Sequence, residues 1–284
     1  MPARLIELGY TIRLVDSATI HPSPYVAPSR CWGSLKGDAK FCTFNYNIGR
    51  YKISIDFNSL SSTFKDAISV VRGLGLRYLW IDSLCIIQDD KLDWENEAAS
   101  MEQVSSGAYF TIAASSAKSS CEGFLSPRKP RPCVQLSMQS MRRLYVCPYI
   151  NNFHVDTELG NLNGRGWVLQ ERVLSRCSIY FSSTLIYWEC VTGVHCEALM
   201  RLHNPAAAFY GDANFPESAL KCCRDGRQVL VQDLYERYSG LAFTNRSDRF
   251  VAILGLQNRL ARALRTKAAF GFFAIYFARG LLMI

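Results

Sequence analysis

The sequence predicts an α/β fold in which a parallel sheet is flanked by helices, followed by an added α+β portion at the C-terminal side. Three neighbouring segments carry this prediction. Residues 60–75 repeat apolar residues at helical spacing, "LRYLWIDSLCII" is a short continuous apolar run after a glycine, and "AYFTIAASSA" is a second apolar segment further along. A helix between two such buried strands is typical of a parallel sheet.

The segments before this helix are shorter. Residues 1–24 predict a strand-like entry and a loop interrupted by prolines. "YVAPSRCWG", residues 25–33, predicts a strand that runs into a glycine turn, with Pro28 at the edge or end of the sheet. The alternating pattern of "YKISIDF", residues 51–57, predicts another short strand.

The central helix has Ser61 or Ser62 as its cap and Gly73 or Gly75 at its end. After the apolar run, a second helix is predicted from about Asp93, as its cap, to Ser106. The pattern changes after "CEGFLSPRKPRP", a basic stretch rich in proline that is the best candidate for a boundary.

Beyond that boundary the pattern predicts a mixed α and β region. "RRLYVCPYI" is expected to be a strand, "NGRGWVLQERVLS" a loop leading into a helix, and "SIYFSSTLIYWECVTGVHCE" two strands. A polar insertion at 201–227 precedes two final helices, "VLVQDLYERYSGLAF" and "SDRFVAILGLQNRLARALR". We therefore divide the chain into an N-terminal flank (1–24), a main domain (25–200, with a core at 25–125 and a second portion at 140–200) and a helical extension (201–284).

The composition argues against several classes of protein. The net charge is +8, but the 32 basic residues are spread along the chain, which does not favour nucleic-acid binding. No segment reaches the roughly 20 apolar residues of a membrane-spanning helix. The N-terminus does not resemble a secretory signal, so the 11 cysteines are expected to be reduced thiols in the cytoplasm.

Two groups of carboxylates are candidates for a site. Asp82 and Ser83 follow an apolar strand, and ligands of open parallel sheets bind at the carboxyl ends of the strands. The alternative is a turn in which Asp82 bonds its own following amides. Glu97 borders the apolar face that includes Trp94, so desolvation would raise its pKa and suit it to acid or base chemistry. The alternative is a favourable interaction with the helix dipole.

Other polar motifs have structural interpretations. "GRGWVLQER" supplies Arg165, Gln170 and Glu171 around Trp167, which either join the second half of the chain to the first or line the same cleft. Cys85 is expected to be a buried thiol. The spacing of Cys190, His195 and Cys196 fits no usual zinc pattern, so no metal site is predicted.

The chain resembles the fungal heterokaryon incompatibility (HET) domain family. The matching segments are "YVAPSRCWG", "TFKDAISVVRGLGLRYLWIDSLCIIQDDKLDWENEAASM", "TIAASSAKSSCEGF" and "GRGWVLQERVLSRCSIYF…YWEC", in the family's order. The resemblance implies nonself recognition between fungal cells that ends in programmed cell death. It also implies a flavodoxin-like fold similar to TIR domains, several of which cleave NAD at the nicotinamide–ribose bond with a glutamate.

The family pattern of a tryptophan followed three residues later by a glutamate favours Glu97 over Glu95 as the catalytic candidate. The implied ligand pocket is formed by Ser29, Trp32, Gly33, Asp82, Ser83 and Trp94. One departure is that Arg30 stands where the family usually has an aromatic residue, and Pro28 where it has an apolar one. NAD is implied as a substrate, with no cofactor.

Two alternatives stay open. The protein could be a non-catalytic signalling module of the same pathway, in which Trp32, Trp94, Asp82 and Glu97 are structural. It could also be a decayed or truncated paralogue, because the tail stops before the family's usual helical continuation. Self-association and other incompatibility proteins are the implied partners, and a cytoplasmic location is expected.

Overall fold

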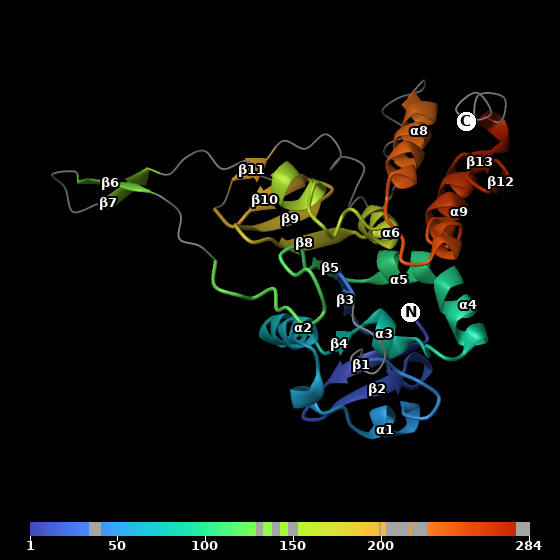
Figure 1. Cartoon of the computed structure of the whole chain (residues 1–284), viewed down its shortest axis with the longest axis horizontal. Coiled ribbons are helices and arrows are strands. Elements are labelled where there is room, and N and C mark those ends of the chain that lie inside the picture. Colours follow the sequence, from blue (N-terminus) through green and yellow to red (C-terminus); the bar gives the residue numbers. More distant parts are fainter. Residues whose placement is uncertain are drawn as a thin grey trace.

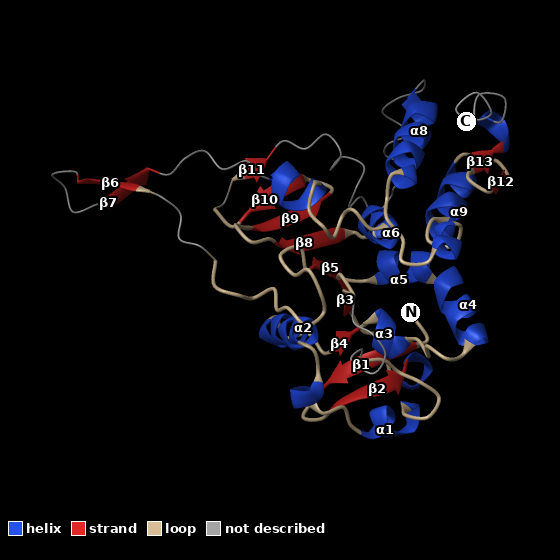
Figure 2. Ribbon diagram, in the orientation of Figure 1, coloured by secondary structure: helices blue, strands red, loops and turns tan. Residues whose placement is uncertain are grey.

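The computed structural model contains one mixed β-sheet with helices on both sides (Figures 1 and 2). It describes residues 1–33, 41–128, 133–137, 143–146, 153–198, 200–202, 216 and 226–276. The nine strands lie in the order β11-β10-β9-β8-β5-β3-β4-β1-β2. Their bounds are Arg4–Leu8 (β1), Ile12–Asp16 (β2), Tyr25–Ser29 (β3), Tyr78–Leu79 (β4), Phe110–Ala113 (β5), Cys177–Phe181 (β8), Ile186–Cys190 (β9), Gly193–Cys196 (β10) and Arg201–Leu202 (β11).

The predicted parallel sheet holds for the four central strands, β4, β3, β5 and β8. The strands on both outer sides are antiparallel, which makes the whole sheet mixed. The N-terminal flank adds the hairpin β1–β2 beside β4, the second portion adds β8, β9 and β10 beside β5, and the first residues of the predicted extension add β11. Segments on both sides of the proline-rich stretch thus share one sheet.

The order of the parallel strands creates a switch point between β3 and β5. The chain leaves β3 toward β4 on one side, and it later enters β5 on the other side of β3. Connections that diverge in this way leave a crevice at the carboxyl ends of the two strands. Ser29 and Ala113, the last residues of β3 and β5, are paired at this edge.

The helices match the predictions in part. In Figure 1, α2 lies on one side of the central strands and α4 and α5 lie on the other. The helices are Ile48–Ile53 (α1), Ser62–Gly73 (α2), Asp82–Cys85 (α3), Lys91–Ala99 (α4), Met101–Gly107 (α5), Gly166–Leu174 (α6), Gly226–Ser239 (α8) and Leu254–Ala263 (α9). The prediction of a helix after residue 60 is confirmed by α2, whose N-cap is Ser61.

Two predictions about local structure were wrong, and a third holds only in part. The alternating segment at 51–57 is not a strand, because α1 ends only at Ile53 and packs against β2. The apolar run at 76–87 pairs as a strand over two residues and then turns into α3, since a short apolar run suits a buried helical turn equally well. The segment at 178–197 forms three antiparallel strands instead of two.

The second predicted helix is divided into α4 and α5 at Ser100, and its cap is Asp90 rather than Asp93. The Asp90 carboxylate accepts hydrogen bonds from the amides of Leu92 and Asp93. Its side chain therefore satisfies helix donors, which leaves the Asp93 side chain to make a contact elsewhere.

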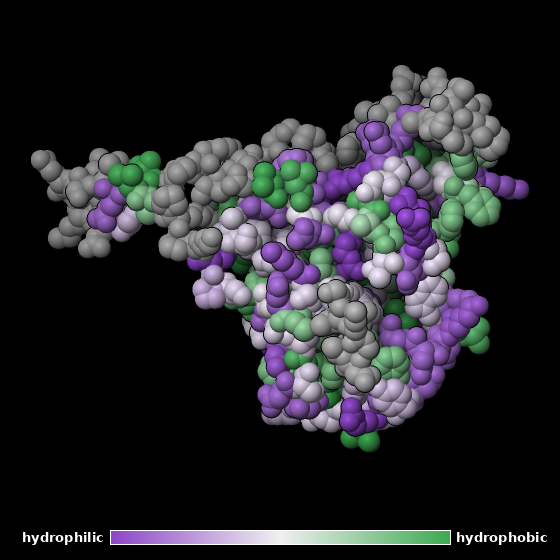
Figure 3. Space-filling model, viewed as in Figure 1, coloured by the Kyte–Doolittle hydropathy of each residue, from purple (hydrophilic) through white to green (hydrophobic). Residues whose placement is uncertain are grey.

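Apolar side chains form the main core around the sheet, and a second cluster joins α6 to α8 and α9. The hairpin of β6 (Val134–Ser137) and β7 (Arg143–Val146) extends from the main body in Figure 1. Figure 3 shows hydrophobic residues gathered on this hairpin, where Val134, Tyr145 and Val146 are exposed. Elsewhere on this face, hydrophilic and hydrophobic residues are interspersed over the described elements. The predicted insertion at 201–227 and the tail beyond 276 lie largely outside the described residues.

Candidate functional site

Asp82 lies three residues after the end of β4, and it is the first residue of α3. Its Oδ1 atom accepts hydrogen bonds from Arg30 Nη2 at 2.7 Å and from the Ser83 amide at 2.7 Å. Its Oδ2 atom accepts one from Trp32 Nε1 at 2.6 Å. Asp82 thus bonds its own following amide, as one interpretation predicted, and it also contacts residues beyond the end of β3. Its side chain keeps 34% exposure.

Arg30 organises this edge, although the sequence marked it only as a departure from the family pattern. Its guanidinium donates to Ser120 Oγ at 2.6 Å and Ser83 Oγ at 2.9 Å as well as to Asp82. Its guanidinium carbon also lies over the rings of Trp32 and Phe64, at 5.0 and 4.6 Å from their centroids. Arg30 therefore combines hydrogen bonds with cation–π contacts to two rings.

The second half of the chain meets the same edge through α6. Arg165, just before α6, donates from Nη1 to the Arg30 carbonyl oxygen at 2.6 Å. Burial raises the pKa of Glu171, and nearby Asp82 raises it further, while Ser29, Arg165 and Arg30 oppose this. The Ser29 hydroxyl lies beside the Glu171 carboxyl group without reaching hydrogen-bonding geometry. We call Ser29, Arg30, Trp32, Asp82, Arg165 and Glu171 the edge cluster.

The other two residues of the predicted α6 motif, Trp167 and Gln170, contribute to packing between elements. Trp167 is partly buried against the main core. Gln170 is buried, and its Oε1 atom accepts a hydrogen bond from the Leu256 amide at 3.2 Å. Gln170 therefore joins α6 to α9, while Arg165 and Glu171 belong to the edge cluster.

Gly33 follows Trp32 in a conformation that only glycine adopts readily, with φ of +76°. A Cβ atom at this position would lie 2.6 Å from Ser119 Cβ. Gly33→Ala is therefore expected to lower the free energy of unfolding by about 1–3 kcal/mol. Gly49→Ala in α1 is the matched control, because nothing lies within 4 Å of its added Cβ. Urea denaturation of both variants checks this, and equal stabilities would contradict it.

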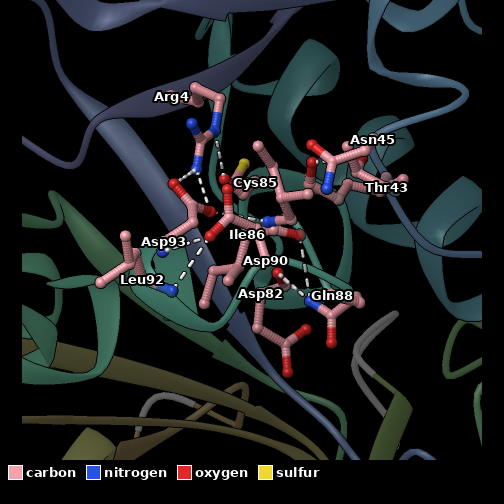
Figure 4. A network of polar contacts seen from close by, with 12 residues as sticks. Arg4, Thr43, Asn45, Asp82, Cys85, Ile86, Gln88, Asp90, Leu92 and Asp93 are labelled. Atoms are coloured by element: carbon pink, nitrogen blue, oxygen red, sulfur yellow. Dashed lines mark hydrogen bonds and ion pairs between the residues drawn. The ribbon is translucent and has the colours of Figure 1, made fainter. Parts of the chain in front are cut away.

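Glu97 lies in a second group, built from α4 and the N-terminal flank. Arg4 Nη2 donates to both Asp93 oxygens at 2.5 Å, and Arg4 Nε donates to the Cys85 carbonyl oxygen at 2.7 Å. Figure 4 shows this network, with the Asp82 side chain pointing away from Arg4 and Asp93. The structure therefore brings Asp82 together with Ser29, Ser83 and Trp32, but places Glu97 with Arg4.

The Glu97 side chain is enclosed, since the residue is only 5% exposed. Burial raises its pKa, Arg4 lowers it, Asp93 raises it, and a backbone hydrogen bond from Ala3 lowers it, with a net upward shift. The raised pKa agrees with the desolvation expected from the sequence. Trp94, the other predicted residue on α4, is partly buried against the main core. No local signal could have identified Arg4, which is 89 residues from Asp93.

Cys85 lies between the two groups and is completely buried, as the sequence predicted. Burial raises the pKa of its thiol, with Arg4, Glu97 and Asp82 among its charged neighbours. Within the described part of the chain, no group of three or more His, Cys, Asp or Glu side chains could hold a metal ion. No helix among these residues is long and apolar enough to cross a membrane.

The largely apolar hollow between α9 and the hairpin of Ala268–Ala269 (β12) and Phe272–Phe273 (β13) is separate from the edge cluster. Its lining includes Arg262, Arg265 and Lys267 but no carboxylate. It offers no pair of acid and base, so we assign the candidate site to the edge cluster.

Comparison with known families identifies the chain. The family model described as heterokaryon incompatibility protein (HET) matches residues 25–171, which is just over half of the 284 residues. This range starts at β3, ends in α6 and contains every residue of the edge cluster. No curated protein and no solved structure gives a significant match. The chain belongs to the heterokaryon incompatibility (HET) family.

Proposed function

We propose that the protein acts in nonself recognition between fungal cells and promotes programmed death of the fused compartment. Membership of the HET family supports the link to heterokaryon incompatibility. We further propose that it acts in the cytoplasm, together with further copies of itself and with other incompatibility proteins.

The proposed chemistry is the hydrolysis of NAD at the nicotinamide–ribose bond. Water attacks the ribose carbon, the bond to the nicotinamide nitrogen breaks, and ADP-ribose, nicotinamide and a proton are the products. The edge cluster carries this proposal, because the Arg30–Asp82 pair and Trp32 lie at the carboxyl ends of parallel strands. When the four parallel strands β3, β4, β5 and β8 are numbered 1 to 4 along the chain, their order in the sheet is 2-1-3-4. Flavodoxin-like folds have the same order, which supports the proposed TIR-like arrangement.

Glu97 is the proposed catalytic residue on the α4 side. As the nicotinamide leaves, positive charge develops on the ribose, and a carboxylate next to it stabilises that charge. Ala3 and Arg4 enclose Glu97, so the N-terminal strand would have to move before a substrate could reach it. We propose that self-association drives this movement.

Nicotinamide release by concentrated purified protein tests the proposal. The wild-type protein is expected to release nicotinamide, and Glu97→Gln to reduce the rate by roughly 100-fold or more. This variant should fold, because glutamine removes a carboxyl group whose charged form is disfavoured by burial. Its thermal midpoint is expected to equal or exceed that of the wild type. Glu95→Gln, at a half-exposed position of the same helix, is the matched control.

Undiminished nicotinamide release by folded Glu97→Gln would refute the role of Glu97. A second candidate function is a non-catalytic assembly module, and the 5% exposure of Glu97 favours it. In that case the wild-type protein would kill cells without consuming NAD, and Glu97→Gln would kill them equally well.

A further inference from the structure

Buried polar atoms without a hydrogen-bond partner gather at the carboxyl ends of β3 and β5. Three of them belong to the edge cluster: Ser29 Oγ, Arg30 Nε and Glu171 Oε2. The hydroxyl groups of Ser115 and Ser116, just after β5, are also buried and without partners. A buried polar group without a partner costs free energy, so a concentration of them at one edge indicates a place where a ligand supplies the missing bonds.

The position of these atoms is fixed by the sheet and by α6. Ser29 is paired with Ala113 in the parallel ladder, and its carbonyl oxygen accepts a hydrogen bond from the Ala114 amide at 3.0 Å. Ser29 and Arg30 are only 4% and 6% exposed. Glu171 is half-buried as a residue, but its Oε2 atom is fully buried. The three atoms therefore belong to a rigid part of the fold.

The charges and donors of the edge cluster select the chemistry of the ligand. Two guanidinium groups, of Arg30 and Arg165, balance the two carboxyl groups of Asp82 and Glu171. This balance favours neither an anion such as phosphate nor a free cation. The unsatisfied atoms are one donor (Arg30 Nε), one acceptor (Glu171 Oε2) and one hydroxyl (Ser29 Oγ) that can do both. Neighbouring hydroxyl groups of a sugar complement such a set.

The edge cluster also has an accessible rim. The Asp82 side chain is 34% exposed, Trp32 is partly exposed, and Gly33 is exposed. An apolar ring beside hydrogen-bonding groups is a common feature of ligand sites. Trp32 and Asp82 are therefore the accessible members of the cluster, whereas the Ser29, Arg30 and Glu171 atoms are buried next to them.

We propose that Ser29, Arg30 and Glu171 bind the hydroxyl groups of the terminal ribose of the ligand, the ribose that ADP-ribose has and ADP lacks, with Trp32 and Asp82 at the entrance of the site. The choice of a ribose-containing ligand rests on the proposed function. Glu171 is therefore assigned to binding of the ligand, whereas Glu97 lies in the separate group with Arg4.

Calorimetric titration of the full-length protein with ADP-ribose tests this proposal, and ADP is the matched ligand without the terminal ribose. ADP-ribose is expected to bind at least tenfold more tightly than ADP. Glu171→Gln should weaken ADP-ribose binding roughly tenfold or more, because it replaces a carboxyl oxygen that contacts a sugar hydroxyl with an amide, and should leave ADP binding unchanged. Glu95→Gln should change neither affinity.

Ser29→Ala separates a binding role from a structural one. Removing a buried hydroxyl without a partner should raise the thermal midpoint, yet it should also weaken ADP-ribose binding. If the protein cleaves NAD, Glu171→Gln should raise KM more than it lowers kcat.

Several results would overturn the proposal. They are equal affinity for ADP and ADP-ribose, no binding of either, or unchanged ADP-ribose affinity in folded Glu171→Gln and Ser29→Ala. If neither ligand binds, or if both variants keep the wild-type affinity, only water forms hydrogen bonds with the unpartnered atoms. Failure of the proposed function looks different, because ADP-ribose would still bind through Glu171 while the wild-type protein releases no nicotinamide.

Discussion

Replacing Arg172 with methionine is expected to lower the free energy of unfolding by about 3–5 kcal/mol. The Arg172 side chain is only 3% exposed, and its Nε and Nη2 atoms donate to the two oxygens of Glu189 at 2.8 and 2.7 Å. Nη2 also donates to Glu158 at 2.7 Å. Methionine would leave Glu189, whose side chain is 1% exposed, as a buried charge without its cation.

Urea denaturation measures the effect, with Lys52→Met as the control. Lys52 pairs with Asp16, but both side chains are more than 40% exposed, so its loss should cost less than about 1 kcal/mol. The double variant Arg172→Met/Glu189→Gln should recover part of the stability, because it removes the uncompensated charge as well. If Arg172→Met loses no more stability than Lys52→Met, the buried pair does not hold α6 to β9.

The loss of stability in Arg172→Met is also expected to depend on pH. Burial raises the pKa of Glu158, but Arg172 and Arg237 outweigh burial and lower the pKa from 4.5 to about 2. A carboxyl group with a lowered pKa stabilises the fold above its unfolded pKa and loses that contribution as the pH falls toward the folded value. The difference in the free energy of unfolding between the wild type and Arg172→Met should therefore become smaller as the pH falls from 4.5 to 2.

Replacing Arg30 with alanine is expected to cost roughly 2–4 kcal/mol of stability. It removes three charge-assisted hydrogen bonds, to Ser120, Asp82 and Ser83, and the cation–π contacts of the guanidinium with two rings. Part of this loss is offset because Asp82 remains partly exposed and can be hydrated.

Arg30→Tyr is the informative companion, since an aromatic ring at this position can pack against Trp32 and Phe64. We expect it to retain about half of the stability that alanine loses, by analogy with aromatic pairs of similar geometry. Thermal and urea unfolding of the three proteins measure this. A tyrosine variant as unstable as the alanine variant would mean that the position is specific for a guanidinium group.

The sequence predicted the elements whose signal is local. The apolar periodicity of Phe64, Ala67, Ile68 and Val71 is sufficient for α2, and these four side chains are buried in the structure. The apolar segment around Phe110 is the central strand β5. Local patterns failed where two structures bury the same residues, as at Asp82–Cys85, which lie within the apolar run but form a helical turn.

The candidate site was predicted only in part. Asp82, Ser83, Ser29 and Trp32 were expected to share a pocket, and they do lie together around Arg30. Glu97 was expected in the same pocket but lies with Arg4. The roles of Arg30 and Glu171 could not be predicted from the sequence, because Asp82 lies 52 residues from Arg30, and Ser29 and Asp82 are also distant from Glu171 along the chain.

By itself, the sequence determined the α/β class, the main helices and membership of the HET family, because periodicity and motif order are written in neighbouring residues. The tertiary structure alone decided which side chains meet at the edge of the sheet. The strand order places β4 and β5 on either side of β3 and α6 across their ends, so Ser29, Asp82 and Glu171 converge. The pairing of β1 with β4 brings Arg4 to α4 and encloses Glu97. Such contacts depend on how distant segments pack, so residue spacing along the chain does not predict them.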